Sequence, residues 1–290
     1  MSDREKMNIQ WYPGHMTKTR RQIEADLKQV DAVCEIVDAR IPMSSRNPDI
    51  DAICGSKPRI IVLNRMDLAD PNATKKWAAF FKKKGMAVLA TDCKTRKGIV
   101  DFTPAARLAC AEKLERDAKR GMNRPLRVMV VGIPNVGKST LINQISGRKG
   151  AKAENRPGVT RGKQWVTVDS GLQLLDTPGI LWPKFEDPEV GMMLAYTGAV
   201  KEDVIDIEEL SCRLIELLHK YYPQTLLERY KVEAPESTPG WELIEMAGRK
   251  RGYLISGGEV NTERMSKVLL DEFRGGKLGK FTLEMPEEQV

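Results

Sequence analysis

The sequence predicts an α/β fold with a doubly wound, mostly parallel sheet, followed by a small all-helical domain. Three observations predict this class. Apolar, β-branched runs alternate with helical patterns over roughly the first 180 residues. A glycine-rich loop at residues 132–139 joins a predicted strand to a predicted helix. After about Pro183 only helical patterns remain, so we place the first domain at residues 1–185 and the second at 186–290.

The elements of the first domain are assigned in chain order from their hydrophobic periodicity. The predicted elements are strands at residues 32–37, 59–63, 87–90 and 126–131, helices at 73–84, 99–119 and from 138 onward, and a hairpin of 165–168 with 172–175. Because helical patterns separate most of the strands, the strands are expected to run mostly parallel.

The second domain is predicted from helix boundary signals and apolar stripes. Asp206 with Glu209 resembles a capping box, and Asn261 is expected to cap a last helix that stops at Gly275-Gly276. Residues 232–240 contain two prolines and are predicted to form a loop. The side chains of the apolar stripes are expected to be core: Ile207, Leu210, Leu214, Leu217, Leu218, Tyr221, Trp241, Ile244, Met246, Met265, Val268, Leu269 and Phe273.

The composition is typical of a globular cytoplasmic protein. Hydrophobic residues make up 41% of the chain and charged residues 30%. No stretch approaches the ~20 apolar residues of a membrane span, and the acidic first residues do not resemble a targeting signal. The five cysteines, an odd number without a Cys-x-x-Cys pair, argue against zinc and against a disulfide framework. We therefore expect no membrane partner.

The charge distribution favours a polyanionic partner. The formal net charge is +7 and the pI is about 9.1. Residues 148–163 hold six basic side chains against one acidic one, and residues 249–280 hold eight against four. Each segment is either a contact for nucleic acid or an ordinary solvated face, and charge alone does not decide between them.

Residues 132–139, GIPNVGKS, match the phosphate-binding pattern G-x-x-x-x-G-K-[S/T]. In such a loop, backbone N–H groups cradle a β-phosphate, the lysine neutralises the β- and γ-phosphates and the serine hydroxyl ligates Mg²⁺. The strand–loop–helix setting argues against a purely structural loop. The predicted nucleotide contacts here are Asn135, Val136, Gly137, Lys138, Ser139 and Thr140, with Ser139 also a Mg²⁺ ligand.

Residues 176–179, DTPG, close a predicted strand downstream of the phosphate loop. Asp176 is expected to hold Mg²⁺ through water, and the Gly179 N–H is expected to contact the γ-phosphate. Thr160 is a predicted second Mg²⁺ ligand, the alternative being an ordinary loop threonine. Together with the loop, these residues predict a Mg²⁺-dependent nucleotide triphosphate site.

Residues 64–67, NRMD, follow the predicted strand at 59–63 and predict recognition of guanine. A carboxylate at Asp67 can accept from guanine N1–H and from the exocyclic amine, a pair of donors that adenine lacks. Asn64 is expected to contact the N7 edge of the base and the phosphate loop. The segment lies at a strand end, where ligands bind in such sheets.

The rest of the base-reading segment departs from the usual pattern Asn-Lys-x-Asp. Arg65 stands in the lysine position, where its stem can lie over the purine, although arginine and lysine are not equivalent. Met66 completes the predicted contact set. Asp92 and Cys93, after the next strand, are a weaker candidate for backbone contact with the guanine O6.

The base-reading segment precedes the phosphate loop, whereas in an ordinary small GTPase the phosphate loop comes first. This order indicates a P-loop GTPase domain with a circularly permuted sequence. Residues 116–125, RDAKRGMNRP, are polar and end in a helix-breaking proline, so we interpret them as the joint between the rearranged halves. Such a joint is plausible because domain termini often lie close together.

These motifs in this order resemble the circularly permuted GTPases of ribosome assembly, and among them the ribosome biogenesis GTPase A, or YlqF-type, family. The likeness includes residues 11–16 (WYPGHM), 38–42 (DARIP), 157–160 (PGVT) and 273–279 (FRGGKLG). Sister families carry an oligonucleotide-binding barrel or a zinc module, for which this sequence has neither room nor ligands. The resemblance implies late maturation of the large ribosomal subunit, binding to its ribosomal RNA and a helical C-terminal domain that helps contact that RNA.

The residue that orients water for hydrolysis is not obvious, because Ile180 occupies the place where many GTPases carry glutamine. His15 matches a proposed catalytic histidine of the resembled family, and the alternative is that it only holds the N-terminal loop. Asn135 matches an asparagine that helps bind K⁺ in related GTPases, and the alternative is a bond to its own backbone. We therefore expect slow turnover that large-subunit particles and K⁺ stimulate.

The leading interpretation is a GTP-hydrolysing assembly factor that binds GTP and GDP, the large ribosomal subunit precursor and its RNA. A signalling-type GTPase acting on a protein partner is the alternative, and its binding would survive high salt. An ATPase is disfavoured by Asp67, and a general RNA chaperone would show no GTP dependence. The oligomeric state is left open by the sequence.

Overall fold

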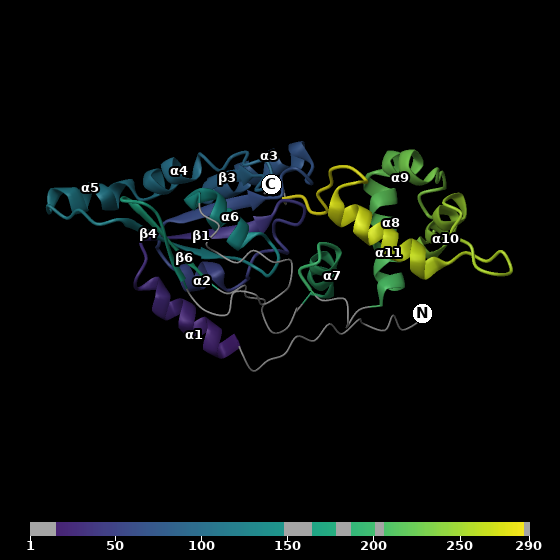
Figure 1. Cartoon of the computed structure of the whole chain (residues 1–290), viewed down its shortest axis with the longest axis horizontal. Helices are drawn as coiled ribbons and strands as arrows, with labels where there is room; N and C mark the ends of the chain where they lie inside the picture. The colour runs from purple at the N-terminus through teal and green to yellow at the C-terminus, as the bar shows by residue number, and fades with distance from the viewer. Residues whose placement is uncertain (1–15, 148–163, 178–186, 201–205, 287–290) are drawn as a thin grey trace. The chain divides into compact units, whose positions relative to one another are not determined.

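The computed structural model describes residues 16–147, 164–177, 187–200 and 206–286. The chain divides into two compact units, and of the described residues 16–177 and 284–286 form the sheet unit, whereas 187–283 form the helical unit. Figure 1 draws the described residues of 16–177 in purple to teal and those of 187–283 in green to yellow. The grouping of residues 284–286 with the sheet unit differs from the predicted helical domain, which ran without interruption to residue 290.

The sheet unit alternates strands and helices as the sequence predicted. Its elements are α1 (Met16–Leu27), β1 (Ala32–Asp38), α2 (Ile50–Cys54), β2 (Arg59–Asn64), α3 (Pro71–Lys83), β3 (Ala87–Thr91), α4 (Phe102–Ala109), α5 (Ala111–Lys119), β4 (Leu126–Val131), α6 (Lys138–Ser146), β5 (Gln164–Asp169) and β6 (Leu172–Asp176). The strands form a six-stranded sheet of order β3-β2-β1-β4-β6-β5, in which only β5 is antiparallel to its neighbour. The predicted α/β class and the predicted hairpin are confirmed.

Helices cover both faces of this sheet, which explains why all seven residues of β1 are buried. On one face, Ile23 of α1 packs in a cluster with Val33 of β1 and Met129 of β4. Trp77 of α3 packs in a second cluster with Leu63 of β2. The pairing of β1 with β2 places Leu63 on the same face as Val33, so both clusters lie on one face of the sheet. The strand ends that form the candidate site are thus held on a fully packed sheet.

The predicted helix at residues 99–119 is wrong as a single element. The structure has two helices, α4 and α5, which meet at Cys110, where φ is −110°. Phe102 and Ala106 of α4 are buried, whereas α5 has no buried residue. The break lets α4 follow the core while α5 leaves it, a change of direction that the helical periodicity does not signal. The short helix α2 and the helix α1 were not predicted.

In the helical unit, the sequence predicted the starts of two of the described helices. Its elements are α7 (Pro188–Tyr196), α8 (Ile207–Tyr221), α9 (Pro223–Tyr230), α10 (Gly240–Lys250) and α11 (Thr262–Gly275). The Asp206 carboxylate accepts from the N–H groups of Glu208 and Glu209, and the Asn261 side chain accepts from that of Arg264. Both predicted caps are confirmed.

The core of the helical unit is formed mainly by one stripe of α8. Leu210, Leu214 and Leu218 are fully buried, and α8 packs against α9, α10 and α11. Tyr221 and Trp241, which were predicted to belong to the core, are instead 57% and 61% exposed. Each lies in a terminal turn of its helix, where neighbouring helices leave the side chain uncovered. Within the described ranges, none of the helices combines the length and the apolar character needed to cross a bilayer.

Candidate nucleotide-binding site

The predicted site residues gather at one edge of the sheet. β1 ends at Asp38, β2 at Asn64 and β3 at Thr91, and the strand pairing places these three residues side by side. β4 leads directly into the phosphate loop, and Val130 of β4 pairs with Asp176 at the end of β6. This carboxyl edge is where ligands bind in open α/β sheets.

The phosphate loop passes so close to its neighbours that two of its positions require glycine. A Cβ atom on Gly132 would lie 2.6 Å from the backbone oxygen of Ile36. At Gly137, φ is +103° and a Cβ atom would lie 2.4 Å from the Asn64 amide nitrogen. Both contacts are shorter than real Cβ atoms tolerate, so the two motif glycines are needed for the closure of the loop.

The Lys138 ammonium lies under the phosphate loop. Its Nζ donates to the backbone oxygens of Gly132 at 2.9 Å and Ile133 at 2.7 Å, and the residue is only 7% exposed. Burial lowers the pKa of Lys138 to about 8, although the neighbouring Asp176 carboxylate opposes this shift. The group is therefore a cation held at the loop, ready to meet a phosphate.

Nucleotide affinity is expected to fall as the pH rises through the pKa of Lys138, which is about 8 in the free protein. Bound phosphates favour the charged ammonium and raise its pKa, so the affinity is constant well below pH 8 and declines above it, towards about tenfold per pH unit. Calorimetric titration of GDP between about pH 7 and pH 9 measures this decline. The variant Lys138→Arg stays charged throughout this range, so its GDP affinity should not decline above pH 8. If the affinity of the parent protein were also independent of pH, the contact of Lys138 with the phosphates would be contradicted.

The chemistry of Asp176 and Ser139 fits a hydrated Mg²⁺ ion. Asp176 is 2% exposed, and its Oδ1 has no hydrogen-bond partner among the residues that the structure describes. The Ser139 hydroxyl is hydrogen bonded to the carboxylate of Asp176. Burial raises the pKa of Asp176 above its usual value, although the Lys138 ammonium and the Ser139 hydroxyl oppose this shift. A buried carboxylate oxygen without a donor is an available acceptor for water on a hard cation.

The side chain of Asn64 joins three parts of the site. Its Nδ2 donates to the Val136 backbone oxygen at 2.7 Å, and its Oδ1 accepts from Thr91 Oγ1 at 3.0 Å and from Cys93 Sγ at 3.2 Å. Asn64 is 3% exposed. The predicted contact with the phosphate loop is present, and it ties the end of β2 to that loop and to the segment after β3.

Arg65 makes a second connection between the same loops. Its NH2 donates to the Asn135 backbone oxygen at 3.0 Å, and its Nε lies 3.8 Å from Asp38 Oδ2. Arg65 and Asn135 each have a φ of 59°, an uncommon conformation for residues other than glycine. The guanidinium thus reaches the two groups through different nitrogen atoms, whereas a lysine would have to reach both from a single nitrogen.

The proposed base reader Asp67 is accessible. Its side chain is 27% exposed, and Lys94 Nζ lies 3.9 Å from Asp67 Oδ2. The neighbouring Met66 N–H donates to the Thr91 backbone oxygen at 3.1 Å, which holds the turn in place. A carboxylate at this position is anchored by its backbone and open to a base.

The Asp92 side chain stabilises the turn that follows β3. Its carboxylate accepts from the Lys94 N–H at 2.8 Å and from Thr95 Oγ1 at 2.5 Å, and its N–H donates to the Lys97 backbone oxygen. Asp92 therefore shapes the loop and its N–H is already engaged, which leaves the Cys93 backbone as the remaining candidate for contact with the base.

Asp38 and Arg40 are part of this edge but were not predicted as site residues. Asp38 accepts from Arg40 Nε at 2.9 Å and from Arg40 NH2 at 2.7 Å, and both residues are almost fully buried. The signal that could have found Asp38 was its place directly after an apolar strand, the same signal that marks Asn64 and Asp176.

The remaining predicted residues are distributed as follows. Val136 is buried in the phosphate loop, and Thr140 is half-buried in α6. His15, Thr160 and Gly179 lie outside the described residues.

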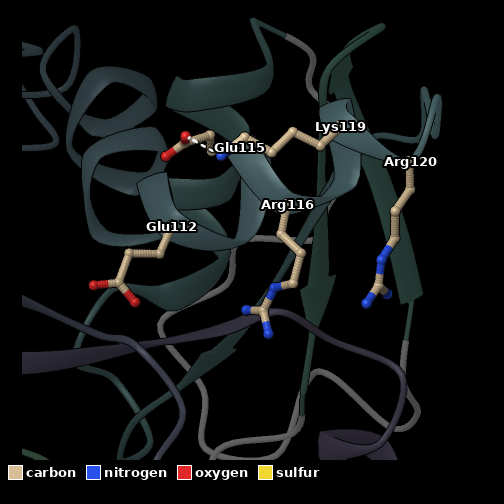
Figure 2. A pocket seen from close by; sticks show the side chains of 5 residues that line it. All are labelled: Glu112, Glu115, Arg116, Lys119 and Arg120. Carbon is tan, nitrogen blue, oxygen red and sulfur yellow. Dashed lines mark ion pairs between the residues drawn. The ribbon is translucent and has the colours of Figure 1, made fainter.

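A shallow hollow elsewhere in the sheet unit has a different character (Figure 2). It is lined by Glu112, Glu115, Arg116, Lys119 and Arg120, all from α5 and the residue after it. Glu115 and Lys119 form an ion pair at 2.7 Å. A hollow with both signs of charge and no glycine loop offers no cradle for a phosphate, so the strand-end site remains the candidate.

Comparisons with known proteins agree with this geometry. A family model described as "50S ribosome-binding GTPase" matches residues 127–233. Ribosome biogenesis GTPase A of Bacillus cereus is 46% identical over 284 residues, covering 97% of this chain and 95% of the relative. The chain belongs to the ribosome biogenesis GTPase A family.

Other members of the ribosome biogenesis GTPase A family show that the similarity extends over the whole fold. The Thermotoga maritima member is 34% identical and covers 97% of this chain and 95% of its own length. The structure of Thermotoga maritima YlqF titled "GNP-bound" has 31% identity and a TM-score of 0.64, and it covers 93% of this chain and 99% of its own. A GDP-bound YlqF structure has 30% identity and a TM-score of 0.67, with 92% and 100% covered.

Proposed function

We propose that this chain is a Mg²⁺-dependent GTPase that acts in the late maturation of the large ribosomal subunit. The observation that carries the proposal is the hydrogen bond of 2.7 Å from Asn64 Nδ2 to the Val136 oxygen. It joins a guanine-reading strand end to a phosphate loop, as a site for a guanine nucleotide requires. The names of the relatives, ribosome biogenesis GTPase A, support the cellular role.

In this proposal each end of the nucleotide has its own residues. Asp67 accepts from the two donors of the guanine edge, and Lys138 with the N–H groups of the phosphate loop neutralises the phosphates. Ser139, Thr160 and Asp176 would hold Mg²⁺. When bound, the ion neutralises charge on the β- and γ-phosphates.

Hydrolysis needs a group that orients water, and Ile180 cannot do so. We assign this role to His15, whose imidazole can hydrogen bond to water. The Asn135 side chain would help to hold K⁺, a cation that can stabilise developing charge. We expect slow turnover in the free enzyme, because large-subunit particles would complete this part of the site.

The expected partner is the ribosomal RNA of the large subunit precursor. The net charge of +7 suits a polyanion, and residues 249–251 place three consecutive basic residues at the end of α10. In the helical unit, Lys220 Nζ lies 5.1 Å from the centre of the exposed Tyr221 ring. Exposed aromatic rings beside cations are typical of surfaces that bind nucleic acid. The segment from Asp176 to about Pro183, which we interpret as a switch that responds to the γ-phosphate, leads into the helical unit, so a bound γ-phosphate can influence that unit.

Co-sedimentation with ribosomal subunits tests the function. We expect binding to large-subunit precursors and not to small subunits, tighter with a GTP analogue than with GDP, and weaker as salt rises. The particles should raise GTP turnover at least about tenfold in K⁺ but not in Na⁺, and His15→Ala should lose this stimulation while keeping nucleotide affinity. Binding that resists salt would favour a protein partner, and equal binding of both nucleotides would contradict the switch.

A further inference from the structure

The segment after α11 (Figure 1, yellow) leads to Glu284, which belongs to the sheet unit and makes several hydrogen bonds there. The Glu284 carboxylate accepts from the Met43 N–H at 2.8 Å and from the Ser44 N–H at 3.1 Å. The backbone oxygen of Glu284 accepts from the Trp77 indole N–H at 2.9 Å. These contacts bridge more than 200 positions of sequence. The Glu284 carboxylate thus binds two backbone N–H groups, and the Trp77 indole of α3 binds the backbone of the same residue.

The donors that Glu284 engages belong to the loop that follows β1, residues 39–46. Ser45 Oγ accepts from the Asp38 N–H at 2.9 Å and donates to the Ile41 backbone oxygen at 2.7 Å. The Arg40 side chain folds back onto the Asp38 carboxylate. The conformation of this loop therefore sets the position of Asp38 at the end of β1.

Asp38 in turn faces the guanine-reading segment. Its Oδ2 lies 3.8 Å from Arg65 Nε, and Arg65 NH2 donates to the Asn135 backbone oxygen. Arg65 lies two positions before Asp67, the proposed base reader. A continuous series of contacts thus leads from Glu284 through the 39–46 loop and Asp38 to the residues that would hold guanine.

We propose that Glu284 is a positioning residue for the guanine-reading segment, residues 64–67, and that docking of Glu284 slows nucleotide release. This inference rests on the proposed nucleotide site. While Glu284 binds the 39–46 loop, the loop keeps the conformation described above. Asp38 then holds Arg65, and with it the turn to Asp67, in place. Coupling between sites is reciprocal, so bound nucleotide strengthens the docking of Glu284 by the same factor.

The same arrangement gives the helical unit access to the nucleotide. Phe281 belongs to the helical unit, where it stacks on Phe273 at 5.9 Å and meets the Tyr222 ring at 4.9 Å. Glu284 follows three residues later and belongs to the sheet unit. Three residues of chain span at most about 11 Å, so a partner that displaces Phe281 far enough must release Glu284.

The experiment compares Glu284→Ala and Glu284→Gln with the matched control Glu236→Gln, the same change at an exposed loop position. Stopped-flow measurement of a fluorescent GDP analogue gives its release rate. We expect release to be about tenfold faster in Glu284→Ala, less so in Glu284→Gln, which keeps an acceptor oxygen, and unchanged in the control. Glu284→Gln preserves shape and volume, so it serves as the test if the alanine variant does not fold.

A second readout separates positioning from general loosening of the fold. Inosine diphosphate lacks the exocyclic amine that Asp67 would read. If the Glu284 variants displace residues 64–67, they should therefore lower the preference for GDP over inosine diphosphate. Arg65→Lys should have a non-additive effect with Glu284→Ala in a double-mutant cycle, because both changes act on the same contacts.

The outcomes distinguish the two proposals. Parent protein that shows no preference for GDP over inosine diphosphate would overturn the guanine site itself. A parent that shows the preference, with folded Glu284 variants that keep both it and the slow release, would overturn only the coupling. Strictly additive effects of Arg65→Lys and Glu284→Ala would overturn the route through Asp38.

Discussion

The variant Asp67→Asn is expected to lose GDP affinity by about 10²–10³-fold and to gain affinity for xanthosine diphosphate. The carboxylate would accept from two donors of guanine, whereas an amide presents its own N–H to one of them. Xanthine carries an oxygen in place of the exocyclic amine, so it can accept from that N–H. The 27% exposure of the Asp67 side chain leaves it accessible to the base. Calorimetric titration of both diphosphates measures the exchange of preference.

Asp101→Asn is the matched control for this change. Asp101 is exposed at the start of α4, and its side chain makes no capping hydrogen bond. The control should keep the parent affinity for both nucleotides. If Asp67→Asn also bound GDP within threefold of the parent, the reading of guanine by this residue would be wrong.

The variant Lys138→Ala should abolish measurable turnover and weaken GTP binding at least about a hundredfold. Two charge-assisted hydrogen bonds to phosphate contribute about 1.5 kcal/mol or more each, and their loss together gives this factor. The substitution also removes the donor to the Gly132 and Ile133 backbone oxygens, so the phosphate loop should lose order. GTP affinity and phosphate release are the measurements.

Lys75→Ala, on the exposed face of α3, is the control for removal of a lysine. It should bind and hydrolyse GTP like the parent protein. Retention of GTP affinity in a folded Lys138→Ala variant would place the phosphates elsewhere, and the strand-end site would then lose its main support.

The fold was readable where the signal was local. The caps Asp206 and Asn261 make bonds within their own first turn, so a few neighbouring letters specify them. The break at Cys110 was not readable, because amphipathic periodicity continues across it while the core that α4 follows does not. The exposure of Trp241 was missed for the same reason, since periodicity records a face and not what covers it.

The candidate site divides in the same way. The glycines, Lys138 and Asp67 were identified from spacing alone, because a phosphate loop and a base-reading turn are short, continuous segments. Asp38 lies within a recognised sequence motif, yet its position beside Arg65 depends on the pairing of β1 with β2. Asn64 was expected to contact the loop, but its bonds to Thr91 and Cys93 required the register of β3.

The amino-acid sequence by itself determined the order of the strands, the permuted arrangement of motifs and the chemistry available for phosphate and guanine. Tertiary structure alone decided that Arg65 donates to the Asn135 backbone oxygen, 70 positions away, and that the Glu284 carboxylate binds the loop after β1. The physical reason is how far apart in the sequence the interacting groups lie. Turn chemistry and helix caps act over a few bonds of chain, whereas strand register and chain return bring together groups whose separation in sequence carries no pattern.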